Sequence, residues 1–214
     1  MKKAVFILIV FSGFAVSCSS VSRSVKNAFT YCYEGRYTGI DTLINIEGYY
    51  SLHPILIFYD NGLVVSPIYR DAEQLLRNGF SFLQEETKNP KTINSKYSIF
   101  NFIECGSYII CGDTIKVQLI HKSSSINDSW SGYENWYKII DRNTLLYIGR
   151  YILTTNQKEK EFKEKYYPFK GGSTSDFVPV QALPQPNYFW ILKEKWFWCS
   201  EWEWKVFNNK IKRK

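Results

Sequence analysis

Residues 107–121 read SYIICGDTIKVQLIH, and this stretch indicates the fold of the chain. Gly112 and Asp113 separate two runs rich in β-branched and apolar residues, which is the spacing of a tight β-hairpin. The second run alternates as a strand does, with Ile115, Val117, Leu119 and His121 on one face and Lys116, Gln118, Ile120 and Lys122 on the other.

Similar hairpins are expected on both sides of this one. Asn61-Gly62, which follows Asp60, separates the apolar runs 54–59 and 63–68, and Asn-Gly accepts the positive φ values of a hairpin turn. A turn at 141–143 joins the runs 134–140 and 144–153, and the run 44–52 opens the series. These runs predict an all-β, antiparallel fold, either a barrel or a sandwich.

Two segments break the strand pattern. Good helix formers after Asp71 and the stop signal Asn78-Gly79 predict a short helix at about 71–77. Residues 154–187 combine dense charges, the run GGSTS at 171–175 and several prolines, which is typical of a linker.

The hairpins resemble those of the lipocalin-like (calycin-type) small lipoproteins of the Bacteroidetes. The residues that carry the resemblance are 48–50 (GYY), 56–65 (LIFYDNGLVV), 106–110 (GSYII), 112–117 (GDTIKV) and 136–140 (WYKII). Lipocalins themselves open with Gly-x-Trp, and Tyr50 stands at the Trp position here. The resemblance implies a barrel over residues 44–153 that can enclose one small ligand.

The composition excludes several classes of protein. Of the 214 residues, 45% are hydrophobic, 18% are aromatic and 22% are charged, which is too apolar for a disordered chain. The one long apolar run lies near the N-terminus, so a multi-span membrane protein is not expected.

The N-terminus has the features of a lipoprotein signal peptide, which we assign to residues 1–17. Lys2 and Lys3 precede an apolar stretch, and residues 15–18 (AVSC) resemble the bacterial lipobox. That resemblance implies that Cys18 becomes the N-terminal residue and carries acyl chains such as palmitate. The alternative is an ordinary cleavage site and a soluble, secreted protein.

The residues after Cys18 point to the outer membrane. Ser19 stands where a retention Asp would be, and no acidic run follows, which favours a periplasm-facing anchor. We expect 18–43 to be a lipid-anchored tether and lead-in. Without residues 1–17 the chain has 25 basic and 20 acidic residues, and nucleic acid is not an expected partner outside the cytoplasm.

Tryptophans crowd the last segment, 188–214. Trp190, Trp196, Trp198, Trp202 and Trp204 all have even numbers, so an extended strand would present them on one face. We therefore predict one or more Trp-rich strands followed by a basic tail. Two interpretations stay open: a core-packing strand, or an aromatic platform or membrane belt, with Trp196, Trp198, Trp202 and Trp204 as candidate ligand-binding residues.

Few residues suit catalysis or metal binding. His53 and His121 are the only histidines, and neither has Cys or carboxylate neighbours at metal-ligand spacing. A Ser–His–Asp arrangement needs only spatial proximity, so the sequence leaves it open. We expect no enzyme activity, no metal and no cofactor.

The cysteines besides Cys18 leave two alternatives. Cys105 and Cys111 lie too far apart to bond if one straight strand holds both. They would pair across a bend or with Cys32 and Cys199, or all four would be free thiols.

Two main functions follow from these features. The first is a lipid-anchored envelope lipoprotein whose β-barrel binds a small apolar or carbohydrate ligand. The second is a non-enzymatic structural or interaction lipoprotein with a solid core, which contacts an envelope protein through its C-terminal aromatic strand.

Overall fold

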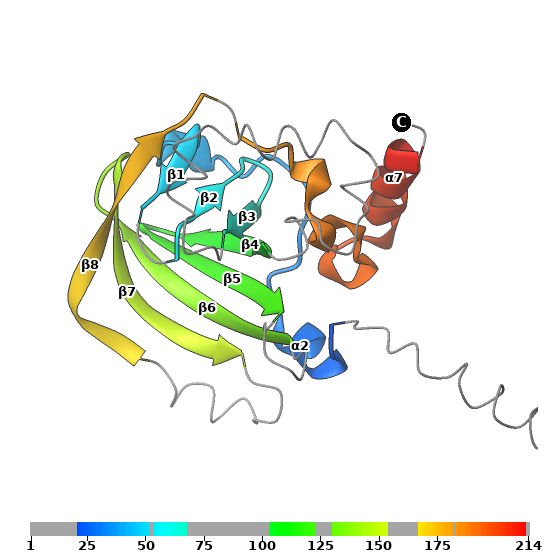
Figure 1. The fold of residues 1–214 in the computed structure, drawn as a ribbon, viewed down its shortest axis with the longest axis horizontal. Coiled ribbons are helices and arrows are strands. Elements are labelled where there is room, and N and C mark those ends of the chain that lie inside the picture. The colour runs from blue at the N-terminus through cyan, green and yellow to red at the C-terminus, as the bar shows by residue number, and fades with distance from the viewer. Residues whose placement is uncertain are drawn as a thin grey trace, which may run out of the picture.

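A computed structural model describes residues 21–51, 54–67, 103–122, 130–153, 167–181 and 183–212. It confirms the all-β prediction, because eight antiparallel strands form a nearly closed barrel (Figure 1). The strands are β1 (Gly48–Tyr50), β2 (Ile57–Phe58), β3 (Leu63–Ser66), β4 (Glu104–Cys111), β5 (Thr114–Lys122), β6 (Trp130–Ile139), β7 (Thr144–Leu153) and β8 (Tyr167–Pro179).

The strands follow one another around the barrel in chain order. Each strand from β2 to β7 pairs with the next one in the chain, and β8 also pairs with β1, with Tyr50 opposite Phe177. The last gap is bridged by Tyr50 and Leu56, which exchange backbone hydrogen bonds of 2.9 and 3.1 Å. The sheet thus curves back on itself, and the fold is a barrel rather than a two-sheet sandwich.

Glycines make two of the predicted turns. Gly62 has φ +93° between β2 and β3, and Gly112 has φ +62° in the two-residue loop that joins β4 to β5. Side chains other than glycine rarely adopt this left-handed backbone, so these positions fix where the hairpins reverse. The predicted helix at 71–77 lies outside the described residues.

The barrel interior is filled with large side chains over much of its length. Tyr50, Phe58 and Tyr137 are each at most 1% exposed. We call the buried set the barrel core, and it consists of Ile40, Ile44, Tyr50, Leu56, Phe58, Val64, Tyr108, Ile115, Val117, Leu119, Tyr133, Tyr137, Leu145 and Tyr147.

One end of the barrel, which we call the plugged end, is closed by the chain before β1. The short 3-10 helix η1 (Ile40–Thr42) inserts Ile40, and Ile44 follows it; both side chains are fully buried. Arg142, from the β6–β7 turn, donates hydrogen bonds of 2.8 and 2.9 Å to the carbonyls of Asp41 and Thr42. These contacts hold η1 across the barrel end.

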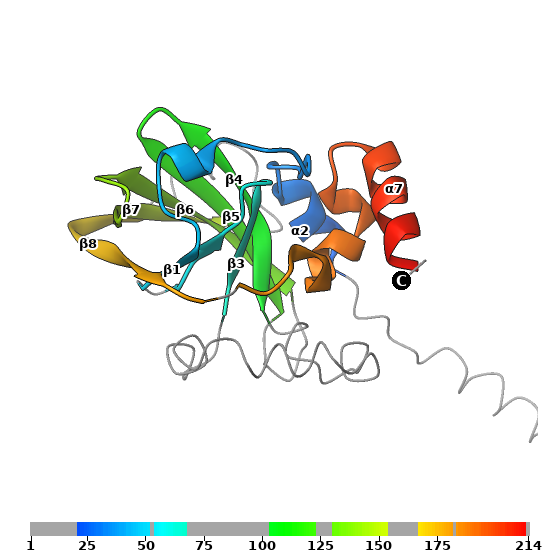
Figure 2. The same cartoon turned by 90° about the horizontal axis from the view of Figure 1, so that it is seen from above.

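A second cluster lies outside the barrel, against β2–β4. There the helices α2 (Arg23–Ala28), η4 (Pro186–Tyr188), η5 (Trp190–Lys193), η6 (Lys195–Phe197) and α7 (Glu201–Lys212) gather on one side of the sheet (Figures 1 and 2). Val25, Phe189 and Phe197 are fully buried in this outer cluster. The first and last segments of the described chain therefore form a second core.

Two predicted segments differ from the structure. The expected tether, 18–43, is structured from Val21 onward, because Val21 and Val25 are buried in the outer cluster. The expected linker, 154–187, contains β8, which runs through the GGSTS residues. Ser173 and Ser175 pair with Tyr147 and Leu145 of β7, so pairing with a neighbouring strand overrides a flexible composition.

The predicted Trp-rich strand is wrong. Residues 190–212 form η5, η6 and α7 instead. Ser200 caps α7, because its side-chain oxygen accepts a hydrogen bond from the backbone N–H of Glu203 at 3.4 Å. Ser-x-x-Glu is a helix-start signal, and here it outweighs the alternating tryptophans.

A candidate ligand-binding site at the polar end of the barrel

Polar side chains gather inside the barrel at the end opposite η1, which we call the polar end. Residues directly opposite each other on paired strands share a face. His121 lies opposite Ser131, and Val117 of the barrel core lies opposite Asn135, which in turn lies opposite Arg150. The polar set consists of Ser66, Glu104, His121, Ser131, Tyr133, Asn135 and Arg150.

Glu104 is central to this set. It is 8% exposed, and one carboxylate oxygen accepts a hydrogen bond from the Tyr133 hydroxyl. Its other oxygen is 3.3 Å from Nδ1 of His121. Burial raises the pKa of the Glu104 carboxyl above its ordinary value of 4.5, although Tyr133 and Arg150 act in the opposite direction. Glu104 can therefore gain a proton at a milder pH than a surface glutamate.

His121 lies next to Glu104 at the end of β5. Its Nε2 shares a hydrogen bond of 2.8 Å with the Ser131 hydroxyl. Burial, and then the charge of Arg150, lower the pKa of His121 below 6.5, so its ring is neutral at pH 7. Nδ1 is within ion-pair distance of Glu104 but is not aligned for a hydrogen bond. The side chain is 28% exposed, so solvent reaches this end of the barrel.

Arg150 supplies the positive charge of the site. Its Nε donates a hydrogen bond of 2.9 Å to the Asn135 amide oxygen, and its guanidinium lies 4.3 Å from the centre of the Tyr133 ring. Asn135 in turn donates to the Tyr137 hydroxyl at 3.0 Å. These contacts fix the guanidinium, whose remaining N–H groups can bind hydroxyl or carboxylate oxygens.

Ser131, His121 and Glu104 have the residue types of a hydrolytic triad, and as in a triad the histidine lies between the serine and the carboxylate. Such a site also needs N–H donors that face the developing oxyanion. Ser131 is within the β5–β6 ladder, and strand N–H groups lie in the plane of the sheet rather than toward the barrel interior. The backbone N–H of Ser131 therefore does not face the barrel interior.

The four candidate tryptophans lie outside the barrel. Trp196 and Trp198 line a surface groove of about 470 Å³, together with Lys26, Glu194, Lys195 and Glu201. Trp196 donates to Glu194 at 2.8 Å, and Trp204, on the inner side of α7, donates to the Lys193 carbonyl at 3.0 Å. Trp202 is 71% exposed. The structure thus brings Trp196 and Trp198 together in one groove, whereas Trp202 and Trp204 lie outside it on α7.

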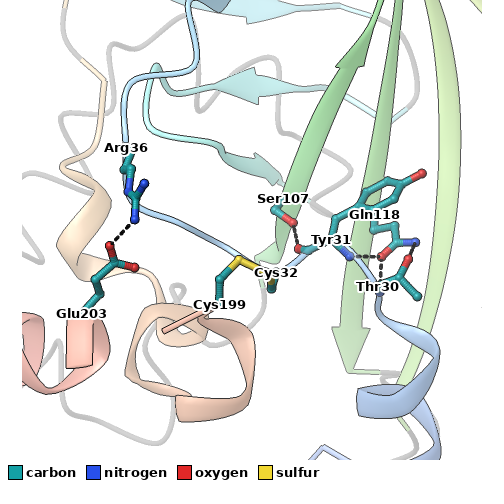
Figure 3. The surroundings of a disulfide bond; sticks show 8 residues. All are labelled: Thr30, Tyr31, Cys32, Arg36, Ser107, Gln118, Cys199 and Glu203. Carbon is teal, nitrogen blue, oxygen red and sulfur yellow. Dashed lines mark hydrogen bonds and ion pairs between the residues drawn. A yellow bond between two sulfur atoms is a disulfide. The ribbon is translucent and has the colours of Figure 1, made fainter. Parts of the chain in front are cut away.

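A disulfide joins Cys32 to Cys199 (Figure 3). Cys105 and Cys111 are free. Beside the disulfide, the Gln118 side chain accepts from the backbone N–H groups of Thr30 and Tyr31 at 2.8 and 3.1 Å. These bonds hold the N-terminal segment on the barrel, where the disulfide attaches the C-terminal segment. The predicted lipid-attachment residue, Cys18, lies outside the described residues.

Sequence reasoning missed most of the polar end. It singled out His121 but not Glu104, Tyr133 or Arg150. The available signal was polar residues at inward positions of otherwise apolar strands, such as Asn135 between Tyr133 and Tyr137. The β-bulge at Tyr147–Gly149 hides the equivalent signal in β7, because it changes which residues face inward before Arg150.

Comparison of the chain with models of known protein families, with curated proteins and with solved structures finds no match. Among the described residues, no group of three or more His, Cys, Asp or Glu side chains could hold a metal ion. No helix in the described part of the chain is long and apolar enough to cross a membrane.

Proposed function

We propose that this protein is a non-enzymatic, lipid-anchored lipoprotein of the cell envelope whose barrel binds a small carbohydrate-like ligand at its polar end. The observation that carries the proposal is the cluster of Glu104, His121 and Arg150 inside a barrel that is otherwise filled with apolar side chains. A buried polar cluster is unfavourable unless its groups are hydrogen-bonded, and a ligand hydroxyl can supply such partners.

The chemistry of the interior favours a polar ligand over an apolar one. Phe58, Tyr137 and the other core residues occupy the described part of the interior toward the plugged end, so a long apolar molecule would have to displace them. Carbohydrate hydroxyls both donate and accept hydrogen bonds. Glu104 and neutral His121 offer acceptors, while Arg150 offers donors.

The location rests on the N-terminal lipobox and is supported by the disulfide. Disulfides form in oxidising compartments such as the periplasm, and Cys32–Cys199 suits that setting. We propose that Cys18 is acylated in the outer membrane and that the barrel faces the periplasm. The intact mass of the mature N-terminal peptide, compared with Cys18→Ala, tests this: a bare N-terminus in the wild type would make the protein soluble and secreted.

Binding is tested by calorimetric titration of the protein with a panel of oligosaccharides from bacterial envelopes. Glu104→Gln keeps the shape of the side chain but removes its charge, and a charged hydrogen bond contributes about 1.5–3 kcal/mol. We therefore expect binding to weaken by about tenfold or more. The matched control is Glu194→Gln, which makes the same change in the groove beside Trp196.

Each outcome of this titration has a clear meaning. Loss with Glu104→Gln and full binding with Glu194→Gln supports the polar end as the site. The reverse result transfers the site to the Trp196 groove. If no oligosaccharide binds, the second function, an interaction lipoprotein with a solid core, is favoured. The exposed Trp202 supports that alternative, although it lies on a helix rather than on a strand.

A further inference from the structure

The outer side of α7 exposes apolar and basic side chains together. Trp202 and Val206, one helical turn apart, are 71% and 49% exposed, and Trp202 is the most exposed large apolar side chain among the described residues. Lys205 and Lys210 are exposed on the same arc of the helix. We call these four residues the α7 outer face.

The opposite side of α7 is held against the protein. The Trp204 indole donates to the Lys193 carbonyl at 3.0 Å, and the Phe207 ring packs 5.2 Å from the Trp198 ring. Glu203 forms an ion pair of 3.1 Å with Arg36. The outer face is therefore presented in a fixed direction.

The composition of the outer face matches a membrane interface. Indole rings favour the headgroup region, and lysines are attracted to anionic lipids. From Glu201 to the C-terminus the sequence contains five basic and two acidic residues, and it ends with Lys212, Arg213 and Lys214. A helix with Trp on one side and this charge suits the surface of an anionic bilayer.

Helix α2, which follows the proposed anchor residue in the sequence, lies on the same side of the molecule as α7. Helix α2 begins at Arg23, five residues after Cys18, and five residues span at most about 18 Å. Lys26 of α2 and Glu201 of α7 line the same groove. Both helices lie beyond the outer face of β2–β4 (Figure 2). A bilayer that holds Cys18 is therefore within reach of α7.

We propose that the α7 outer face lies on the lipid bilayer to which Cys18 is anchored, with Trp202 inserted among the headgroups. This inference rests on the proposed lipid anchor. This bilayer contact would set the orientation of the molecule. The barrel would be attached to the membrane both at α7 and through the short tether, and two attachments restrict how it can rotate.

The test uses the full acylated protein, purified from membranes and reconstituted into vesicles of equal amounts of phosphatidylethanolamine and phosphatidylglycerol with brominated acyl chains. Bromine quenches nearby indoles. We expect bromolipid quenching of the wild-type protein and loss of most of it in Trp202→Phe. The control Trp204→Phe, on the inner side of the same helix, should retain it.

The outcomes separate the anchor from the contact. Protein that does not float with the vesicles refutes the anchor. Protein that floats but shows equal quenching in the wild type and in Trp202→Phe refutes the bilayer contact. Chemical cross-linking of the reconstituted protein tests whether a second copy of the chain binds the α7 outer face instead. A cross-linked dimer that is lost in Trp202→Phe, in protein without lipid quenching, would assign the face to that second copy.

Discussion

At the scale of single residues, the polar end contains an acidic and a basic side chain whose pKa values are shifted in opposite directions by burial. Burial raises the pKa of Glu104 and lowers that of His121, so desolvation favours the neutral form of each. Tyr133 and Arg150 partly compensate for Glu104 through a hydrogen bond and a nearby charge. At neutral pH the ionised Glu104 therefore lowers the stability of the fold, whereas His121 does so only on acidification.

Replacing Glu104 with Gln should change how stability depends on pH. The folded wild type keeps the Glu104 proton to a higher pH than the unfolded chain, so its stability falls as pH rises above 4.5 through the raised pKa. Gln does not ionise. We therefore expect the free energy of unfolding of Glu104→Gln, relative to the wild type, to be higher at about pH 8 than at about pH 5.

Urea unfolding at the two pH values measures this difference. His121 has the opposite dependence, since its lowered pKa destabilises the fold on acidification, but it is present in both proteins. The comparison therefore reports on Glu104 together with its effect on His121, whose Nδ1 is 3.3 Å away. An unfolding difference that is the same at both pH values would contradict the raised pKa.

At the scale of elements, the close packing of β4 on β5 depends on the missing side chain of Gly106. A Cβ at Gly106 of β4 would overlap the backbone carbonyl of Gln118 on β5, whereas a Cβ at Gly132 of β6 would lie 3.2 Å from the Leu119 carbonyl. β5 is thus approached more closely by β4 than by β6. This difference in spacing arises from how the strands pair, so it cannot be read from the sequence of a single strand.

Gly106→Ala should therefore destabilise the barrel far more than Gly132→Ala. Overpacking of this kind typically costs about 1–3 kcal/mol, and the Gly106 overlap involves backbone, which cannot rotate away. At Gly132 we expect a change below about 1 kcal/mol. Thermal unfolding of the two variants gives the answer, and equal midpoints would show that β4 and β5 can separate without cost.

The elements also show which parts of the fold the sequence predicts. Gly62 and Gly112 indicate their turns from the local sequence alone, and both hairpins are confirmed. β8 has no comparable signal, because its glycines and serines become a strand only by pairing with β7 and β1. At the polar end, His121 was noticed as a residue type, but its proximity to Glu104 and Ser131 required the β4–β5–β6 register.

At the scale of the whole molecule, two cores share one sheet. The barrel core fills the inside, and the outer cluster covers β2–β4 with both ends of the described chain. The Cys32–Cys199 disulfide closes a loop of 167 residues around the barrel. The two ends of the described chain are thereby joined to each other as well as packed on the sheet.

The double variant Cys32→Ser, Cys199→Ser should be markedly less stable. Closing a loop of this length reduces the entropy of the unfolded chain by an amount equivalent to about 5 kcal/mol in the loop-closure model. We expect a loss of about 3–5 kcal/mol, seen as a lower midpoint of thermal unfolding. Cys111→Ser, at an exposed free thiol, is the matched control and should not shift the midpoint.

The sequence by itself determined the antiparallel hairpins, the inward and outward faces of β5 and the lipobox-like N-terminus, because each depends on residues close together in the chain. Only the tertiary structure decided the closure of β1 on β8, the Cys32–Cys199 pairing and the cluster of Glu104, His121 and Arg150. These features join residues far apart in sequence. Their partners are selected by strand register and by burial against the two cores, which local patterns do not encode.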